Sequence, residues 1–273
     1  MKKAREKVIE NLEYYIDKTL KSIEMSKGTP YYARNKDEAL KILRDIIGSG
    51  KVIVKSKSMV TEEIGVREYL EKLGNEVWET DLGELLVQIA NEKPMHPIIP
   101  AIHIPRERAV ELLKKVGLKL KPNDPIELIV SKVREFLREK FAKADIGISG
   151  ANVMAADTGA IVLVENEGNI RNSTNLPLTH IAIVGVEKIV ATYYEAVLQS
   201  MVQSAYAGIY PPTYLSVITG PSSTADIEGY RVYGVHGPKQ LHVILYDGGR
   251  VAAFRKEPLN KQLLCIKLSL IHI

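Results

Sequence analysis

Lysine and serine side chains follow a short apolar segment and could together bind an anion. The segment VIV, residues 52–54, is typical of a buried strand, and KSKS follows it before a helical pattern begins. Ligands of open α/β sheets bind at the carboxyl ends of strands, where N–H groups of the next helix favour negative charge. Lys55, Lys57 and Ser58 are therefore candidates to bind a carboxylate or a phosphate. The alternative is that Ser58 only caps the helix and that solvent surrounds both lysines.

Two histidines lie among prolines in the segment MHPIIPAIHIP, residues 95–105. His96 and His103 could act as acid or base, because histidine titrates near neutral pH. No HxxxH pair and no nearby cysteine completes a metal-binding pattern. The alternative is a rigid loop in which each histidine is simply hydrogen-bonded.

Two further polar segments, GANVMAADTGA and ENEGN, follow the ends of predicted strands. Small residues in the first segment allow a ligand to approach the backbone closely. A carboxylate at either place could serve as a base or a nucleophile. The alternative is a hairpin followed by a polar loop, since Asn and Gly are common turn formers. The candidates in these segments are Asn152, Asp157, Thr158, Glu165 and Asn169.

The last polar segment, TGPSSTADIE, covers residues 219–228 and is followed by GVHGP. Hydroxyl groups beside glycine can form an anion-binding nest with backbone N–H groups. Thr224, Asp226 and His236 are the candidates here, and two turns with a helix cap are the alternative. No Walker loop, GxSxG, HExxH or GxGxxG motif is present in the chain.

Alternating helix and strand patterns must position these segments. The expected helices cover residues 1–27, 36–47, 60–73, 82–91, 105–117, 125–143 and 193–206. The expected strands cover residues 52–54, 76–78, 145–149, 160–164, 181–184, 214–218, 231–233 and 241–245. Continuous apolar strands in a β-α-β-α order are typical of a mostly parallel sheet covered by helices. We expect a helical N-terminal extension at 1–30 and one α/β domain over 31–250.

Composition narrows the class of protein. The 273 residues are 45% hydrophobic and 26% charged, as in ordinary globular proteins, and the net charge is +4. The charges are mixed in sign, so we expect no nucleic-acid partner. No apolar segment is long enough to span a bilayer, and the charged N-terminus shows no signal-peptide core. One cysteine excludes an intramolecular disulfide framework, and we expect a cytoplasmic protein.

Taken in order, the quoted motifs resemble the LUD-domain family of lactate-utilization proteins. The motifs are KSKSMVTEEIG, ETDLGELLVQIANEKPMHPIIPAIH, GANVMAADTGAIVLVENEGN, and TGPSSTADIE with GVHGP. The resemblance covers roughly residues 30–265 and is strongest to the iron-sulfur subunit of that system. It implies a Rossmann-like α/β sheet of the sugar-phosphate isomerase and CoA-transferase type. It also implies a cytoplasmic three-protein complex that oxidises L-lactate to pyruvate and passes electrons through iron-sulfur clusters.

The resemblance also implies which residues line the family's pocket. Glu79 joins the candidates already named, and we expect Asp157, Glu165 and His236 to be catalytic. A glutamate is expected at the position of Asp157, so the carboxylate there is shorter in this chain. The expected substrate-binding residues are Lys55, Lys57, Ser58, Glu79, His96, His103, Asn152, Thr158, Asn169, Thr224 and Asp226.

The C-terminal sequence departs from the family. The family continues into a run C-x2-C-x2-C-x3-C-P, which binds 4Fe-4S clusters through thiolates. Cys265 fits the first cysteine, but Leu268 and Ile271 stand at the next two positions. Residues 251–273 therefore read as the truncated or frameshifted remnant of a ferredoxin-like region. We expect no cofactor in this chain, because one thiolate cannot hold a cluster.

Three functions stay open at this point. The first is the LUD domain of a lactate-oxidising complex, which would bind lactate, pyruvate or a phosphate compound and assemble with the other lactate-utilization subunits. The second is an isomerase, cyclo-ligase or acyl-CoA transferase on the related fold, acting on an anionic small molecule. The third is a non-catalytic assembly domain.

Overall fold

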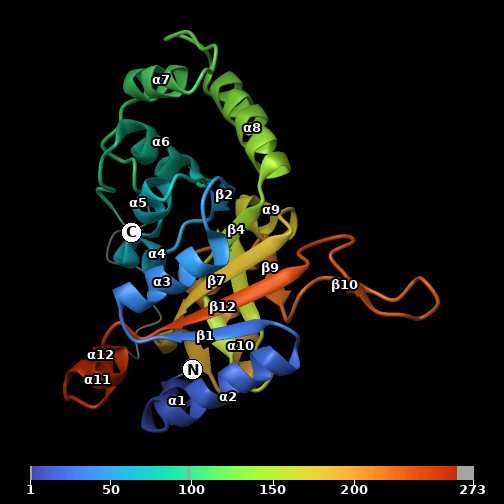
Figure 1. Ribbon diagram of the computed structural model, residues 1–273. Helices are drawn as coiled ribbons and strands as arrows, with labels where there is room; N and C mark the ends of the chain where they lie inside the picture. Colours follow the sequence, from blue (N-terminus) through green and yellow to red (C-terminus); the bar gives the residue numbers. More distant parts are fainter. Residues whose placement is uncertain (1, 97–98, 263–273) are drawn as a thin grey trace.

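A six-stranded parallel sheet forms the centre of the molecule. The computed structural model describes residues 2–96 and 99–262. The strand order is β1-β12-β7-β4-β2-β3, and every pairing in this sheet is parallel. The strands are β1 (Thr29–Ala33), β12 (Gln240–Tyr246), β7 (Thr179–Gly185), β4 (Ile146–Ser149), β2 (Val52–Lys55) and β3 (Glu76–Glu79). The predicted mostly parallel α/β sheet is confirmed (Figure 1).

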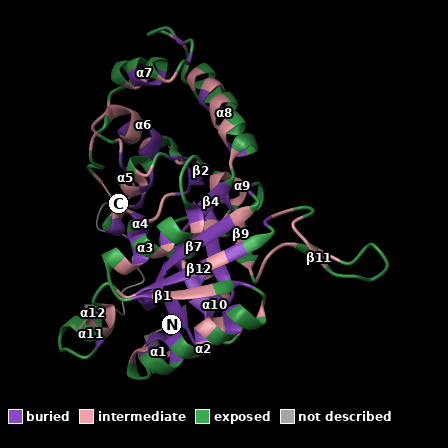
Figure 2. Cartoon of the chain, in the orientation of Figure 1, coloured by how far each residue is buried: buried purple, intermediate pink, exposed green. Residues whose placement is uncertain are grey.

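Alternating side chains of the strands enter two hydrophobic cores, one on each face of the sheet. On β12, Val243 and Leu245 face one core, and Ile244 faces the other, as the two-residue period of a strand requires. Helices α1 (Lys2–Glu10) and α2 (Leu12–Met25) contribute to the first core. Helices α3 (Lys36–Ile47), α4 (Met59–Ile64) and α5 (Val66–Lys72) contribute to the second. Burial on both faces explains why these strands are apolar along their length (Figure 2).

The N-terminal segment differs from its prediction in two ways. The single helix expected over 1–27 is two helices, which are interrupted at Asn11. Thr29–Ala33, which the sequence did not mark as a strand, pairs with β12 at the edge of the sheet. A proline in TPYYA obscures the strand pattern, yet an edge strand tolerates a residue without an N–H group. The N-terminal helices therefore pack on a sheet whose edge strand, β1, is formed by the residues that directly follow them.

A second, four-stranded sheet packs beside the first. Its order is β8-β5-β6-β9, and only the β5–β8 pairing among these strands is parallel. The strands are β8 (Ile189–Val190), β5 (Val153–Ala155), β6 (Ile161–Glu165) and β9 (Tyr214–Ile218). Strands β5 and β8 are too short to show a pattern, and the sequence analysis missed both. Helix α10 (Tyr193–Tyr206) packs against β5 and β6, and its predicted bounds are confirmed.

Three helices form a small cluster above β3. They are α6 (Leu82–Ala90), α7 (Arg106–Lys115) and α8 (Ile126–Lys143), and their apolar side chains form a core of their own. Pro105 and Pro125 stand at the N-cap of α7 and α8, so each helix begins one residue after the proline at which it was expected to start. In contrast, the helix predicted over 60–73 is interrupted at Gly65, which has a left-handed φ of 72°. A non-glycine residue would rarely adopt this conformation, so the glycine permits the break.

The remaining elements are short. They are α9 (Asn169–Asn175), the 3-10 helix η1 (Val186–Lys188), β10 (Ser223–Thr224), β11 (Val232–Tyr233), α11 (Arg250–Phe254) and α12 (Leu259–Gln262). Strands β10 and β11 pair only with each other and belong to an arm, residues 219–239, that projects from the body (Figure 1). Within residues 2–96 and 99–262, no helix is long and apolar enough to cross a membrane.

Candidate functional site

The order of the strands opens a crevice between β2 and β4. The chain leaves β2 towards β3 at the edge of the sheet and later returns to β4 on the opposite side of β2. Strand β7 pairs with β4 on the side of β4 that faces away from β2. The connections that leave β2 and β4 therefore diverge, and ligands of open α/β sheets bind at such a switch point.

A pocket of about 200 Å³ lies at this switch point. We call it the switch pocket and define it by Ser56, Lys57, Ser58, Asn152 and Lys188, which all line it. Its lining contains two lysines and no aspartate or glutamate. The pocket is smaller than the roughly 300–1,000 Å³ of drug-sized ligand sites, so it suits a molecule of few atoms.

Local contacts orient the polar groups of the switch pocket. The side-chain oxygen of Asn152 accepts the N–H of Val164 at 3.0 Å, which leaves its NH₂ end as the donor. The N–H of Ser56 donates to the carbonyl of Ile148 at 2.9 Å and ties the loop after β2 to β4. A Cβ on Gly150 would lie 2.5 Å from the hydroxyl of Ser58. The glycine therefore leaves room for the Ser58 side chain at the pocket wall.

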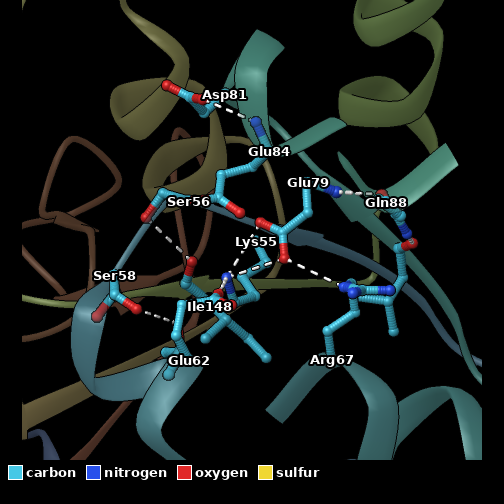
Figure 3. A network of polar contacts seen from close by, with 12 residues as sticks. Lys55, Ser56, Ser58, Glu62, Arg67, Glu79, Asp81, Glu84, Gln88 and Ile148 are labelled. Atoms are coloured by element: carbon cyan, nitrogen blue, oxygen red, sulfur yellow. Dashed lines mark hydrogen bonds and ion pairs between the residues drawn. The ribbon is translucent and has the colours of Figure 1, made fainter. Parts of the chain in front are cut away.

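Lys55 does not line the switch pocket, contrary to the predicted contact with an anion. Its side chain is fully buried and points between two carboxylates (Figure 3). Its amino group lies 2.9 Å from a carboxylate oxygen of Glu79 and 2.8 Å from one of Glu62. The parallel register explains the first contact, because Lys55 and Glu79 are paired as the last residues of β2 and β3. Lys55 therefore serves as the counter-ion of buried glutamates.

Two cations and two carboxylates lie together at the end of β2. Arg67 lies 3.7 Å from Glu79, and together with Lys55, Glu62 and Glu79 it forms what we call the Lys55 cluster (Figure 3). Burial opposes the charged form of Lys55, but attraction by Glu79 and Glu62 outweighs it and raises the pKa of the amine. Burial raises the pKa of Glu79 to about 7, and the charge of Lys55 opposes this rise. Burial also raises the pKa of Glu84, and Glu62 adds to that effect.

The raised pKa of Glu79 predicts a pH-dependent stability. Between its ordinary pKa of 4.5 and about 7, folded Glu79 holds a proton that the unfolded chain has released. The free energy of unfolding should therefore fall as pH rises through this window. Urea unfolding at pH 5 and pH 8 should show a larger fall for the unaltered protein than for Glu79→Gln.

Glu76→Gln provides the control on the same strand. Hydrogen bonds from Lys140 and Trp78 lower the pKa of Glu76, so its contribution to the pH dependence lies below pH 4.5, and Glu76→Gln should leave the fall between pH 5 and pH 8 unchanged. Equal pH dependence of the unaltered protein and Glu79→Gln would contradict the assignment. The comparison uses the change in the free energy of unfolding with pH and not its value at one pH. The reason is that Glu79→Gln also weakens the contact with Lys55 at every pH.

A larger hollow of about 650 Å³ is lined in part by Glu62 and Arg67 of the Lys55 cluster. Its lining contains four basic residues, Lys36, Arg67, Lys72 and Lys93, and four glutamates. Those charges cancel, so this hollow offers no net attraction for an anion. The switch pocket is therefore the better candidate for an anionic ligand despite its smaller size.

Glu165 has a structural position at the end of β6. Its buried carboxylate accepts the N–H of Ile170 at 2.9 Å and that of Arg171 at 3.2 Å, at the start of α9. Burial raises the pKa of Glu165, and these backbone bonds oppose the rise. Asn169 lies at the first position of α9, outside the switch pocket. A catalytic role for Glu165 stays a prediction, since its carboxylate already accepts hydrogen bonds from backbone N–H groups of α9.

The structure places Asp157 and Thr158 away from the switch pocket. Asp157 is exposed in the turn between β5 and β6, where its carboxylate accepts the N–H of Tyr193 at 2.9 Å. The carbonyl of Thr158 accepts the hydroxyl of Ser26 at 3.1 Å. Asn152 lies at the opposite end of β5 and does line the pocket. The expected catalytic role of Asp157 stays a prediction that its position does not support.

The two histidines of the proline-rich loop also lie outside the switch pocket. His103 contacts the carboxylate of Glu92 at 2.8 Å, and Arg108 pairs with the same carboxylate. The ring of His96 accepts the N–H of Ile99 at 3.0 Å. These contacts match the alternative of a rigid loop with hydrogen-bonded histidines.

The last three predicted residues lie on the arm and do not line the switch pocket. Thr224 donates its hydroxyl to Asp226 at 2.6 Å, and both lie near β10 (Figure 1). His236 is exposed beyond β11. The order of motifs along the chain suggested one shared pocket, but none of these residues lines the switch pocket.

Sequence reasoning missed Lys188 and Ser56 in the pocket, and Glu62 and Arg67 in the cluster. Lys188 belongs to η1, which directly follows β7. Its position after the predicted strand 181–184 was the available signal, because all parallel strands deliver polar residues to the same edge. Among the described residues, no group of three or more His, Cys, Asp and Glu could hold a metal ion.

The parallel sheet and its covering helices define an α/β domain, with the switch pocket as its candidate ligand site. Comparison with known families is more specific, because the sequence profile of the LUD domain matches residues 16–246. The match covers most of the chain, and the chain therefore belongs to the LUD-domain family.

Curated relatives agree with this family. Lactate utilization protein B of Bacillus subtilis (strain 168) is 40% identical over 250 residues, 90% of this chain and 50% of that protein. Uncharacterized electron transport protein YkgF of Escherichia coli (strain K12) is 36% identical over 257 residues, 93% of this chain and 52% of that protein. The chain thus spans about half the length of these relatives.

One solved structure is also similar. It is the crystal structure of a DUF162 family protein from Deinococcus radiodurans, with 14% identity and a TM-score of 0.44. The similarity covers 87% of this chain and 98% of that chain. A TM-score this low supports no conclusion about function.

Proposed function

We propose that this chain is the LUD-domain part of an electron-transport protein of lactate utilization. Two relatives that match nine-tenths of the chain carry the names Lactate utilization protein B and electron transport protein. On this proposal the chain works in the cytoplasm with other lactate-utilization subunits. These names do not favour the alternatives of an isomerase, a cyclo-ligase, an acyl-CoA transferase or an assembly domain.

We infer that the switch pocket binds a small carboxylate such as lactate or pyruvate. The observation that carries this inference is its lining, which combines two lysines with hydroxyl and amide donors and contains no acidic residue. Ammonium groups and oriented N–H or O–H donors are the groups that bind carboxylates most strongly. Lys57 and Lys188 would supply the charge, while Ser58 and Asn152 would orient the oxygens.

Neighbouring acids limit how strongly Lys57 attracts an anion. Burial raises the pKa of Glu167, Asp81 adds to that rise, and Lys57 opposes it. Lys57 therefore lies close enough to interact with this carboxyl as well as with the pocket. The second lysine, Lys188, belongs to another element, so the pocket has cations on two walls.

An iron-sulfur cluster is not supported by the residues of this chain. Ferredoxin-like clusters are held by four cysteine thiolates, and the sequence contains one cysteine, Cys265. That residue and the rest of 263–273 lie outside the described residues. We therefore propose that the part of the function carried by this chain is ligand binding and assembly, and derive no electron-transfer step through a cluster.

Binding of lactate and pyruvate tests the proposed pocket. Lys57→Ala and Lys188→Ala should each weaken binding about tenfold or more, because a hydrogen bond to a charged group contributes roughly 1.5–3 kcal/mol. Isothermal titration calorimetry of the two variants measures the change directly.

Lys51→Ala is the matched control, since this exposed lysine precedes β2 at the opposite edge of the sheet. It should bind both ligands as the unaltered protein does. The proposal is wrong if the unaltered protein binds neither ligand, or if both pocket variants retain full affinity.

A further inference from the structure

A second concave site lies between α8 and α9. The groove has a volume of about 420 Å³, within the roughly 300–1,000 Å³ of small-molecule sites. We call it the α8 groove and define it by Val130, Arg134, Leu137, Arg138, Asn169 and Asn172, which all line it. None of its lining residues belongs to the switch pocket. Figure 1 shows the C-terminal end of α8 close to α9.

One wall of the α8 groove is apolar. Val130, Val133, Leu137 and Phe141 lie three or four residues apart on α8 and therefore share a face of the helix. Val130 is 48% exposed, and Leu82, which also lines the groove, is 37% exposed. Apolar groups grouped in a concavity and in contact with water favour the binding of an apolar molecule there.

Two arginines border this apolar wall. Arg134 and Arg138 are one helical turn apart, and both are exposed. Within residues 2–96 and 99–262, neither guanidinium makes a hydrogen bond or an ion pair. Other cations of the same helix are paired, as Lys132 is with Glu135 and Lys143 with Glu139. The α8 groove therefore presents two unused charge-assisted donors beside an apolar surface.

The opposite wall provides neutral polar groups. Asn169 and Asn172 are half-buried on α9 and face the groove from one helix. Their amides can donate or accept hydrogen bonds. Glu167 also lines the groove and is its one acidic residue. Two arginines and one glutamate leave an excess of positive charge, which selects for an anion.

We propose that the α8 groove binds an organic anion that combines a flat apolar body with a carboxylate or sulfonate group. The apolar body packs on Val130, Leu137 and Phe141. The charged end meets the guanidinium groups of Arg134 and Arg138, whose planar donors match carboxylate geometry. This ligand class differs from the small carboxylate of the switch pocket, because lactate and pyruvate have no apolar body to fill the groove.

Three probes distinguish the contribution of the apolar body of the ligand from that of its negative charge. 2-Naphthoate has the apolar body and the charge, 2-naphthalenemethanol has the body alone, and acetate has the charge alone. Calorimetric titration should show one 2-naphthoate bound per chain, at least tenfold tighter than either of the other probes. The proposal is overturned if 2-naphthoate binds no more tightly than acetate or 2-naphthalenemethanol.

Variants then place the probe in the α8 groove. Arg134→Ala/Arg138→Ala should weaken 2-naphthoate binding at least tenfold. Lys132→Ala/Lys143→Ala is the matched control, because it removes two positive charges from paired, surface positions of the same helix. The control should bind as the unaltered protein does. Equal affinity of the arginine variant and the control would overturn the proposal.

Val130→Ser provides an independent variant, since this half-exposed residue contributes to the wall of the groove. It should weaken 2-naphthoate binding several-fold and leave the circular dichroism spectrum unchanged. Lactate should neither displace 2-naphthoate nor bind less tightly to the arginine variant. Displacement by lactate would assign the probe to the switch pocket and overturn the proposal, whereas failure of lactate to bind would concern the proposed function alone.

Discussion

Replacing Lys55 by methionine should lower the free energy of unfolding by about 3–5 kcal/mol. Methionine is close to lysine in length and fills most of the same space, so the loss reports the charge. Glu79 would keep its buried carboxyl, which is 1% exposed, without the amine that lies 2.9 Å away. Glu62 would lose the same partner at 2.8 Å. Urea unfolding followed by circular dichroism measures the effect.

Lys57→Met is the control for that experiment. It removes the same charge two residues further along, from a side chain that is not buried. We expect a loss of stability well below that of Lys55→Met, together with weaker carboxylate binding. A Lys55→Met variant within about 1 kcal/mol of the unaltered protein would show that the buried pair contributes little.

A double-mutant cycle can assign the effect to the pair. In Lys55→Met/Glu79→Gln, neither partner leaves an uncompensated charge on the other. The double variant should therefore lose less stability than the two single variants added together, by roughly 0.5–3 kcal/mol. Simple additivity would instead indicate that Glu62 or Arg67 compensates each change independently.

Replacing Gly147 by alanine should lower the free energy of unfolding by about 3 kcal/mol or more, at the upper end of overpacking costs. A Cβ at this position of β4 would lie 1.7 Å from the carbonyl oxygen of Ser173, which is backbone of α9. The helix could make room only by moving as a whole. Its position is held by Glu165, which accepts N–H groups at the start of α9.

Gly74→Ala is the comparison for Gly147→Ala. Gly74 has a φ of 85°, and no atom lies within 4 Å of an added Cβ. Its replacement should cost only the roughly 1–2 kcal/mol of the left-handed conformation. Thermal unfolding of both variants tests which lowers stability more, the clash of an added Cβ with α9 at position 147 or the left-handed backbone conformation at position 74. Equal losses would contradict the close approach of α9 to β4.

Lys55 and Lys57 have different roles at the carboxyl edge of the sheet. Lys55 and its partners lie in the interior and stabilise the ends of β2 and β3 against each other. Lys57, only two residues away, lies at the wall of the switch pocket. These two lysines of one motif therefore serve different purposes, because β2 ends at Lys55 and Lys57 lies in the loop that follows the strand.

The parallel sheet could be predicted because its physical cause is local. A strand that is buried on both faces must be apolar along its length, and residues 52–54, 181–184 and 241–245 have this character. The bounds of helix α10 were predicted correctly, and the structure shows a local reason for its start, the capping box that Thr192 and Glu195 form. Strands β5 and β8, in contrast, have too few residues for a period to be visible.

The switch pocket could be predicted in part. The segment after β2 was predicted to bind an anion, and Lys57, Ser58 and Asn152 from that prediction line one pocket. Lys188 was missed, because it is more than a hundred residues from Lys57 and no short motif surrounds it, and its position after a predicted strand was the one local signal. The strand order alone brings the two lysines to one pocket.

The sequence by itself determined the class of fold, the family and the segments that carry polar groups, since all three depend on local patterns. Only the tertiary structure decided which polar groups face a ligand. Parallel register pairs Lys55 with Glu79 and removes both from solvent, and His236 does not line the switch pocket. Burial and pairing depend on residues far apart in the chain, so no local pattern could predict them.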